Sequence, residues 1–165
     1  MEKDAYTVLK DICNRACHER HACVNGYKQM LASGNVSQMM ATWRSNWEDI
    51  VESKYADIIR TELPRIYPDL KEEMNKAGIY LNECPENAPS FVRVIITDCV
   101  HVVHIYDYAQ GFVLGEANVV AHGHSQVYNE KFNADITLCD HAYGNIKTGS
   151  AKALDHSTLK NYSEQ

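Results

Sequence analysis

The chain has 165 residues, of which 45% are apolar and 23% are charged, and its formal net charge is -6. This composition is that of a folded globular protein, and the length allows one domain or two very small ones. Residues 1–90 carry 11 basic and 14 acidic side chains and residues 91–165 carry 5 and 8, so neither half offers the basic surface that a phosphate-backbone binder needs.

The sequence also lacks the features of a membrane-inserted or secreted protein. No stretch approaches the roughly 18 apolar residues of a membrane span, and charges occupy the first residues, where a signal peptide would need an apolar run. We therefore expect a cytoplasmic protein without a membrane partner. In that compartment cysteines are expected as reduced thiols, with three disulfides as the alternative. The six are Cys13, Cys17, Cys23, Cys84, Cys99 and Cys139.

The first helix is predicted over residues 4–32, with a bend or break at Asn25-Gly26 and a stop at Gly34. Its apolar side chains recur at spacings of three and four, which is typical of an amphipathic helix. They are Tyr6, Leu9, Ile12, Cys13, Ala16 and Cys17.

The second helix is predicted from about Ser37, a plausible N-cap, to Leu63. Trp43 and Trp47 lie four positions apart on its apolar face. Two interpretations follow: the pair anchors a hydrophobic core, which we favour, or it forms an aromatic platform for a ligand.

A third helix is predicted to begin with Pro68 in its first turn and to end at Gly78. Two prolines and an asparagine then mark residues 85–90 as a linker. The sequence thus predicts a helical domain of about three helices over 1–84 and a β-rich domain over 91–165, an α+β fold.

The β-rich half alternates between apolar and polar residues and is rich in β-branched side chains, which indicates strands. A weak repeat of 17 residues runs through it. Ala117, Ala134 and Ala151 are spaced by this interval, Val119, Ile136 and Ala153 follow two positions later, and counting back reaches Val100 and Val102. Equal spacing of small or apolar residues favours a β-solenoid, in which each coil stacks on the last; a small β-sandwich is the alternative.

Three stretches together resemble a family of uncharacterised proteins from gut Bacteroidetes and their mobile elements. They are ACVNGYKQML (residues 22–31), LPRIYPDLKEEMNKAGIYLNE (residues 63–83) and ANVVAHGHSQV (residues 117–127). The resemblance implies a helical head followed by a C-terminal β-helix, and a role in interaction. It implies no catalytic residues. The chain departs from the clean repeat of that family after Gln126.

A first candidate metal cluster is CNRACHERHAC, residues 13–23. On a helix, Cys13 with Cys17, or Cys17 with His21, could chelate zinc as a four-residue pair. One helix cannot place four ligands around one ion, and the paired short spacings of structural zinc sites are missing. A packed helix with buried thiols is the competing interpretation.

A second candidate site comprises His122, His124, Glu130 and His141, with Asn145 downstream. Two histidines two apart on a strand point to the same face. The order is similar to the cupin pattern, in which three imidazoles and a carboxylate bind a divalent metal. The segment between Glu130 and His141 is short for a cupin barrel, and so is a β-rich half of 75 residues for eight strands. Histidines that decorate the surface of a solenoid are the competing interpretation.

Other catalytic motifs are missing from the sequence, including a GxSxG elbow, a Gly-rich phosphate loop and HExxH. We therefore predict a non-enzymatic protein-interaction module without a cofactor, such as a phage or mobile-element inhibitor of a host or competitor factor. A cupin-like enzyme dependent on a divalent metal is the alternative, and a zinc-stabilised helical adaptor is a third. The open end of a solenoid leaves backbone groups unpaired, so we also expect a homo-oligomer.

Overall fold

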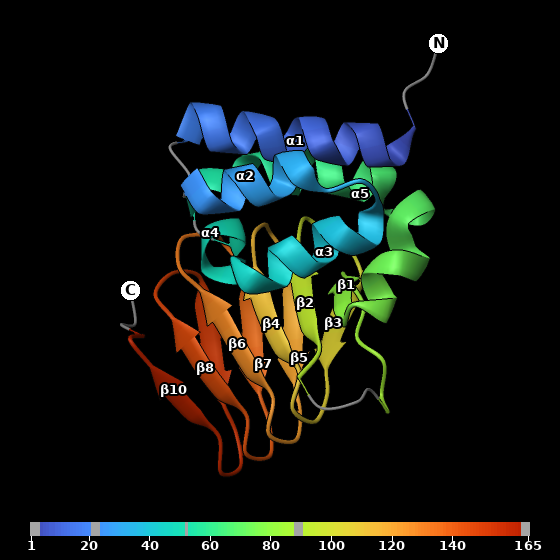
Figure 1. Ribbon diagram of the computed structural model, residues 1–165. Coiled ribbons are helices and arrows are strands. Elements are labelled where there is room, and N and C mark those ends of the chain that lie inside the picture. Colours follow the sequence, from blue (N-terminus) through green and yellow to red (C-terminus); the bar gives the residue numbers. More distant parts are fainter. Residues whose placement is uncertain (1–3, 21–23, 52, 88–90, 163–165) are drawn as a thin grey trace. The chain divides into compact units, whose positions relative to one another are not determined.

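The computed structural model describes residues 4–20, 24–51, 53–87 and 91–162. The chain divides into two compact units, Met1–Ala77 and Gly78–Gln165 (Figure 1). The first holds the helices and the second the strands, which confirms the α+β prediction.

The boundary between the units lies earlier than the predicted end of the helical domain at residue 84. Strand β1 (Ile79–Leu81) pairs in parallel with β2 (Arg93–Ile96), and these backbone hydrogen bonds make it the first strand of the β unit. Within the predicted linker 85–90, residues 85–87 are neither helix nor strand, and residues 88–90 lie outside the described residues.

The helical unit contains more helices than the three expected from the sequence. They are α1 (Ala5–Arg20), α2 (Val24–Ala32), α3 (Val36–Ser45), α4 (Trp47–Val51) and α5 (Ser53–Lys76). The N-cap of α3 is Asn35 instead of Ser37, because the Asn35 side-chain oxygen accepts a 2.9 Å hydrogen bond from the Gln38 backbone N–H. Helices α1 and α3 both pack against α5.

Helix α5 corrects the prediction of a third helix that starts at Pro68. It runs through both Pro64 and Pro68, although each proline lacks the N–H that would bond the preceding turn. The prolines lie half-buried and exposed, away from the buried stripe. That stripe is continuous through Ile59, Leu63, Tyr67, Leu70 and Met74. Burial of this face against neighbouring helices holds the helix together where local propensity would end it.

The two tryptophans are core anchors, as we favoured. Trp43 is 1% exposed and Trp47 is 7% exposed. The Trp43 indole N–H donates to the buried Cys13 sulfur across 3.3 Å. Neither ring offers a platform for a ligand. In the described part of the chain, every helix is too short or too polar to cross a membrane.

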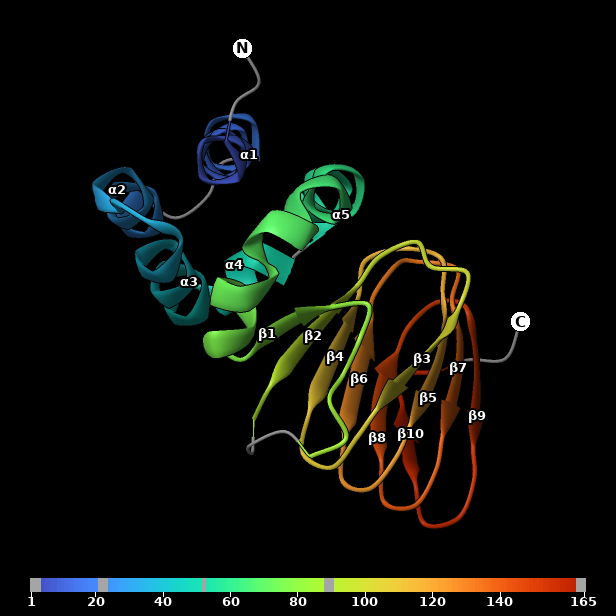
Figure 2. The same cartoon turned by 90° about the vertical axis from the view of Figure 1, so that its right-hand side faces the viewer.

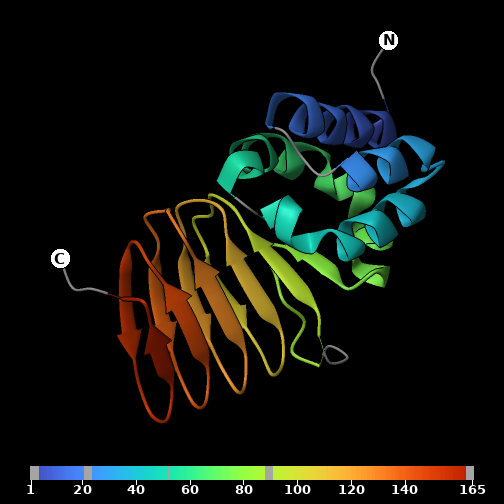
Figure 3. The same ribbon diagram turned by 60° about the vertical axis from the view of Figure 1, so that its left-hand side comes forward.

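The β unit is the predicted solenoid, built from two parallel sheets (Figures 2 and 3). One sheet has the order β1-β2-β4-β6-β8-β10 and the other β3-β5-β7-β9. The remaining strands are β3 (Val102–Ile105), β4 (Gln110–Val113), β5 (Asn118–Ala121), β6 (Gln126–Asn129), β7 (Asp135–Leu138), β8 (Tyr143–Ile146), β9 (Ser150–Ala153) and β10 (Thr158–Lys160). From β2 onward, consecutive strands alternate between the two sheets, so each coil lies on the one before.

The solenoid core is filled by side chains that point inward at alternate strand positions. In β5 and β7 the inward residues are buried and their neighbours are exposed or half-buried. The parallel register stacks Val119 on Ile136, and Ala121 on Leu138. All four side chains are at most 1% exposed. Apolar side chains stacked in this way are the main stabilising contact between coils.

The 17-residue interval holds for some steps of the solenoid, such as Arg93 to Gln110 and Val119 to Ile136, and not for others. Val119 pairs with Ile136 as predicted, but Ile136 then pairs with Ala151, fifteen residues on, instead of with Ala153. In the other direction Val119 pairs with Val103, and Val100 is fully exposed. Coil length therefore varies, and the repeat shifts with it.

The variation is confined to one corner of the coils, which we call the variable corner. Its connections are Thr97–His101, Leu114–Ala117, Glu130–Ala134 and Lys147–Gly149, of five, four, five and three residues. The opposite corner, which we call the constant corner, has four residues in every coil. Its connections are Tyr106–Ala109, His122–Ser125, Cys139–Ala142 and Leu154–Ser157. Only the constant corner can repeat the same side-chain geometry from coil to coil.

The shortest connection depends on Gly149, which has a φ of +88°. A Cβ atom there would clash with the carbonyl oxygen of Ala134 in the coil before. We expect Gly149→Ala to lower the free energy of unfolding by about 2 kcal/mol or more, from backbone strain and the clash together. Gly78→Ala is the matched control, since Gly78 also has a positive φ, of +76°, but open space around it. Denaturant unfolding measures both; equal losses would contradict the steric argument.

Candidate functional site: a strip of stacked rings

Four exposed rings lie one above another along the constant corner. We call Tyr108, His124, His141 and His156 the ring strip. Tyr108 and His124 have ring centroids 5.5 Å apart, His124 and His141 5.1 Å, and His141 and His156 5.2 Å. The planes of neighbouring rings differ by 7° to 14°. Parallel coils repeat about every 4.8 Å, so equivalent side chains stack at close to this spacing.

The residue before each ring fixes the direction of the chain. Asp107, Gly123, Asp140 and Asp155 all have positive φ, between 51° and 62°. Aspartate tolerates this left-handed conformation better than most residues, because its short side chain can bond nearby backbone. Here it also links coils: the Gly123 N–H donates to Asp140 Oδ2 across 2.9 Å, and the Asp140 N–H donates to Asp155 Oδ2 across 3.1 Å.

A second ring cluster lies at the start of the same corner. His104 Nδ1 and His122 Nε2 are 2.9 Å apart, a hydrogen bond in which one ring donates and the other accepts. The ring of Tyr106 lies within 5.2 Å of that of His122, with planes 11° apart. One ring nitrogen of His122 is therefore already engaged in the hydrogen bond with His104.

The four residues predicted as metal ligands lie in three places. His122 bonds His104, whereas His124 and His141 are neighbours in the ring strip. His122 and His124 do not continue one strand as predicted, because Gly123 between them has a φ of +62° and turns the chain.

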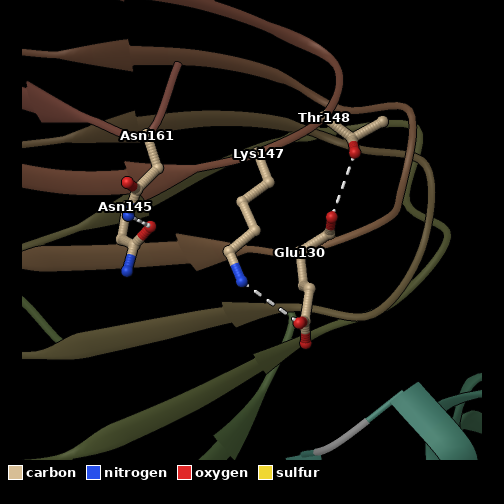
Figure 4. Close-up of polar contacts among 5 residues, drawn as sticks. All are labelled: Glu130, Asn145, Lys147, Thr148 and Asn161. Atoms are coloured by element: carbon tan, nitrogen blue, oxygen red, sulfur yellow. Dashed lines mark hydrogen bonds and ion pairs between the residues drawn. The ribbon is translucent and has the colours of Figure 1, made fainter. Parts of the chain in front are cut away.

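Glu130 lies at the variable corner, separated from His124 by the whole of strand β6, about 13 Å. There its carboxylate is 3.3 Å from Lys147 Nζ, and its carbonyl oxygen accepts from the Thr148 hydroxyl across 3.0 Å (Figure 4). Nearby, the Asn161 amide donates to Asn145 Oδ1 across 2.8 Å (Figure 4). Glu130, Asn145 and Lys147 line a shallow hollow of about 140 Å³, on the scale of a few water molecules.

The ring strip does not form a chelating site as it stands. Parallel rings direct their in-plane nitrogens side by side, and two imidazoles on one metal must bring their nitrogens within about 4.2 Å. Across the described ranges, no group of three or more His, Cys, Asp or Glu side chains is placed to hold a metal ion. Every described strand pair is parallel, whereas a cupin jelly roll is antiparallel. The metal site stays a prediction without supporting geometry.

The cysteines offer no better chemical centre in the described residues. Cys13 is buried against Trp43, and the side chain of Cys17 and residues 21–23 lie outside what the structure describes, so the zinc hypothesis stays a prediction. Cys99 Sγ is 3.1 and 3.3 Å from the two ring nitrogens of His101. A sulfur almost equally far from both lies over the ring, out of line with either lone pair. Burial also raises the pKa of the Cys99 thiol, which disfavours the reactive thiolate.

Histidines on a solenoid surface were one of the two sequence interpretations, but the alignment of His124 and His141 with Tyr108 and His156 in one stack was not predicted. The segments DYAQ, GHSQ, DHAY and DHST begin at residues 107, 123, 140 and 155, each with Asp or Gly, then a ring, then Ala or Ser. Their spacing of 16, 17 and 15 residues hides them from a search for one fixed interval. A search for chemically similar segments that lets the spacing vary by one or two residues would have found them.

The chain was also compared with known proteins. The comparisons with protein-family models, with curated proteins and with solved structures each found no match. The site must therefore be interpreted from its own geometry.

The constant corner predicts one stabilising substitution. Ser125 is fully buried, and its hydroxyl has no hydrogen-bond partner among the described residues. Alanine occupies the equivalent places, Ala109 and Ala142, so Ser125→Ala should fit and raise the free energy of unfolding by about 1 kcal/mol. The control is Ser157→Ala at the same position two coils on, where the hydroxyl donates to the Leu154 carbonyl oxygen across 2.5 Å. Thermal or denaturant unfolding showing both changes destabilising would contradict the argument.

Metal binding can be tested directly. Native mass spectrometry of untagged protein, purified without chelator, should show no stoichiometric metal held by the predicted set, because Glu130 lies far from the histidines. A bound ion that is lost in both His124→Ala and Glu130→Gln would revive the cupin-like site. An ion lost only in Cys17→Ala would instead support the zinc hypothesis.

Proposed function

We propose that this protein is a non-enzymatic interaction module that binds a partner protein through the ring strip. The observation that carries the proposal is the strip itself: four exposed rings stacked on consecutive coils and backed by cross-coil Asp–amide hydrogen bonds. Tyr108 leaves 55% of its surface exposed. Tyrosine is enriched at protein interfaces, since its ring is both apolar and able to bond.

Rigidity supports this role. A side chain that is free in solution loses about 0.5–1.5 kcal/mol when an interface immobilises it. The rings of the strip are already restrained by their neighbours, with centroids 5.1 to 5.5 Å apart. They therefore lose less conformational entropy when a partner binds. Their faces cover one another, which leaves the ring edges for the partner. The strip therefore suits a partner that offers hydrogen bonds and charge.

The charge of the constant corner indicates what kind of partner would bind there. Its four connections contain Asp107, Asp140 and Asp155 and no lysine or arginine. All three aspartates are exposed. Such a strip complements a basic surface, whose arginines could bond the carboxylates and imidazole edges. A basic partner fits an inhibitor of a host or competitor factor, including a DNA-handling protein whose basic site an acidic surface could occupy.

The cellular setting is part of the proposal. Four cysteines that the structure describes, Cys13, Cys84, Cys99 and Cys139, are free thiols. Reduced cysteines suit the cytoplasm. A mobile-element origin rests on the sequence resemblance alone.

Affinity capture tests the function. Tagged wild type and the double variant His124→Ser with His141→Ser are incubated with host-cell extract, alongside Asn133→Ser, an exposed change at the variable corner. We expect a basic protein retained in near-stoichiometric amount by wild type and Asn133→Ser, released by raised salt, and lost with the strip variant. Unfolding curves confirm that each variant is folded. A partner retained equally by all three proteins would place binding elsewhere, and no retained protein would contradict the proposal.

A further inference from the structure

The ring strip has a regular repeat along the solenoid. From Tyr108 to His156, the three steps between ring centroids measure 5.5, 5.1 and 5.2 Å. Each step is one coil, because the strands that directly follow the constant corner, β4, β6, β8 and β10, pair in parallel in that order. A partner that contacts every ring must therefore present side chains at this interval.

An α-helix repeats at nearly the same interval. Its pitch is about 5.4 Å, and residues at i, i+4, i+7 and i+11 lie on one face, one to each turn. Over three steps the helix stays within about 2 Å of the rings, a difference that long side chains absorb. A β-strand fits poorly, since side chains on one of its faces are about 6.7 Å apart and would run about 4 to 6 Å ahead of the rings.

Acidic side chains follow the same interval. Asp107, Asp140 and Asp155 each precede a ring of the strip and are exposed, and Gly123 takes this position in the remaining coil. Asp140 and Asp155 accept backbone N–H groups through Oδ2, and their Oδ1 atoms accept no hydrogen bond within the described chain. The bonds to Oδ2 hold these carboxylates in place, so a cation binds them with little further loss of entropy.

The geometry points to a basic α-helix as the element that binds the ring strip. The helix lies along the solenoid axis and presents one arginine or lysine to each coil. Each cation meets an aspartate Oδ1 or the accepting nitrogen at the edge of a neutral imidazole. Arginine suits this position best, because its planar fork of donors reaches the carboxylate and the neighbouring ring together. This inference rests on the function proposed above and adds the conformation and spacing of the partner.

Three labelled synthetic peptides test the helix. The one-face peptide is an alanine-rich helix of about 20 residues, long enough to fold alone, with arginines at i, i+4, i+7 and i+11. The distributed peptide has the same composition, with its arginines spread around the helix. The broken peptide keeps the arginine spacing of the first but carries a central proline, which interrupts the helix. Circular dichroism measures the helicity of each.

Fluorescence anisotropy at low salt, with the full-length protein, measures binding. We expect the one-face peptide to bind and the other two to bind about tenfold more weakly. Arginines on the far side of a helix about 10 Å wide lie nearly a Debye length from the carboxylates. A broken helix loses the common face altogether. Raised salt should weaken the binding of the one-face peptide.

Matched variants of the protein locate the contact. Asp140→Asn removes a charge but keeps an oxygen that accepts the Gly123 N–H, and asparagine tolerates the positive φ. It should weaken binding of the one-face peptide about threefold. Asp135→Asn makes the same change of charge at an exposed position of β7, outside the strip, and should leave binding nearly unchanged.

Four results would overturn the inference. They are equal binding of the one-face and distributed peptides, equal binding of the broken peptide, binding by none of the three, and equal effects of Asp140→Asn and Asp135→Asn. The proposed function is decided separately by affinity capture. A basic protein that wild type retains and the strip variant loses would still establish the strip as an interface, with a partner that is not helical there.

Discussion

The β unit depends on one constraint: every coil must lie in parallel register on the coil before it. The hydrogen bonds of β5 with β7, and of β6 with β8, set that register. Side chains at equivalent positions then meet whether or not they attract one another. Inside, this stacks Val119 on Ile136; outside, it stacks His124 on His141. The core and the surface strip are two consequences of the same backbone pairing.

The same constraint explains why function is sought at one corner. A corner of varying length cannot repeat its side chains, and Glu130 and Lys147 form a local ion pair at such a place. A corner of four residues in every coil repeats its geometry, so rings and aspartates align there.

Local sequence signals predicted an element correctly where tertiary packing reinforced them, and incorrectly where packing against other elements overrode them. Alternating β-branched residues gave strands, and the spacing of Trp43 and Trp47 gave core anchors. Pro68 predicted a helix start, but burial of the stripe through Leu63 and Leu70 carried α5 across it. The residues of the candidate metal site lie apart for a related reason: the sequence gives only their order, while the left-handed Gly123 and strand β6 decide their direction and distance.

By itself, the sequence determined the α+β division and much of the core, because these follow from hydrophobic periodicity, which is a property of neighbouring residues. It favoured a solenoid through an approximate repeat and left a β-sandwich as the alternative. It also held the Asp-ring-Ala/Ser pattern of the constant corner. Only the tertiary structure decided which residues of different coils face each other. Connections of three, four and five residues shift the register by amounts that no fixed interval reveals. Pairings such as His104 with His122 therefore arise when the coils close, since backbone hydrogen bonds between distant segments align them.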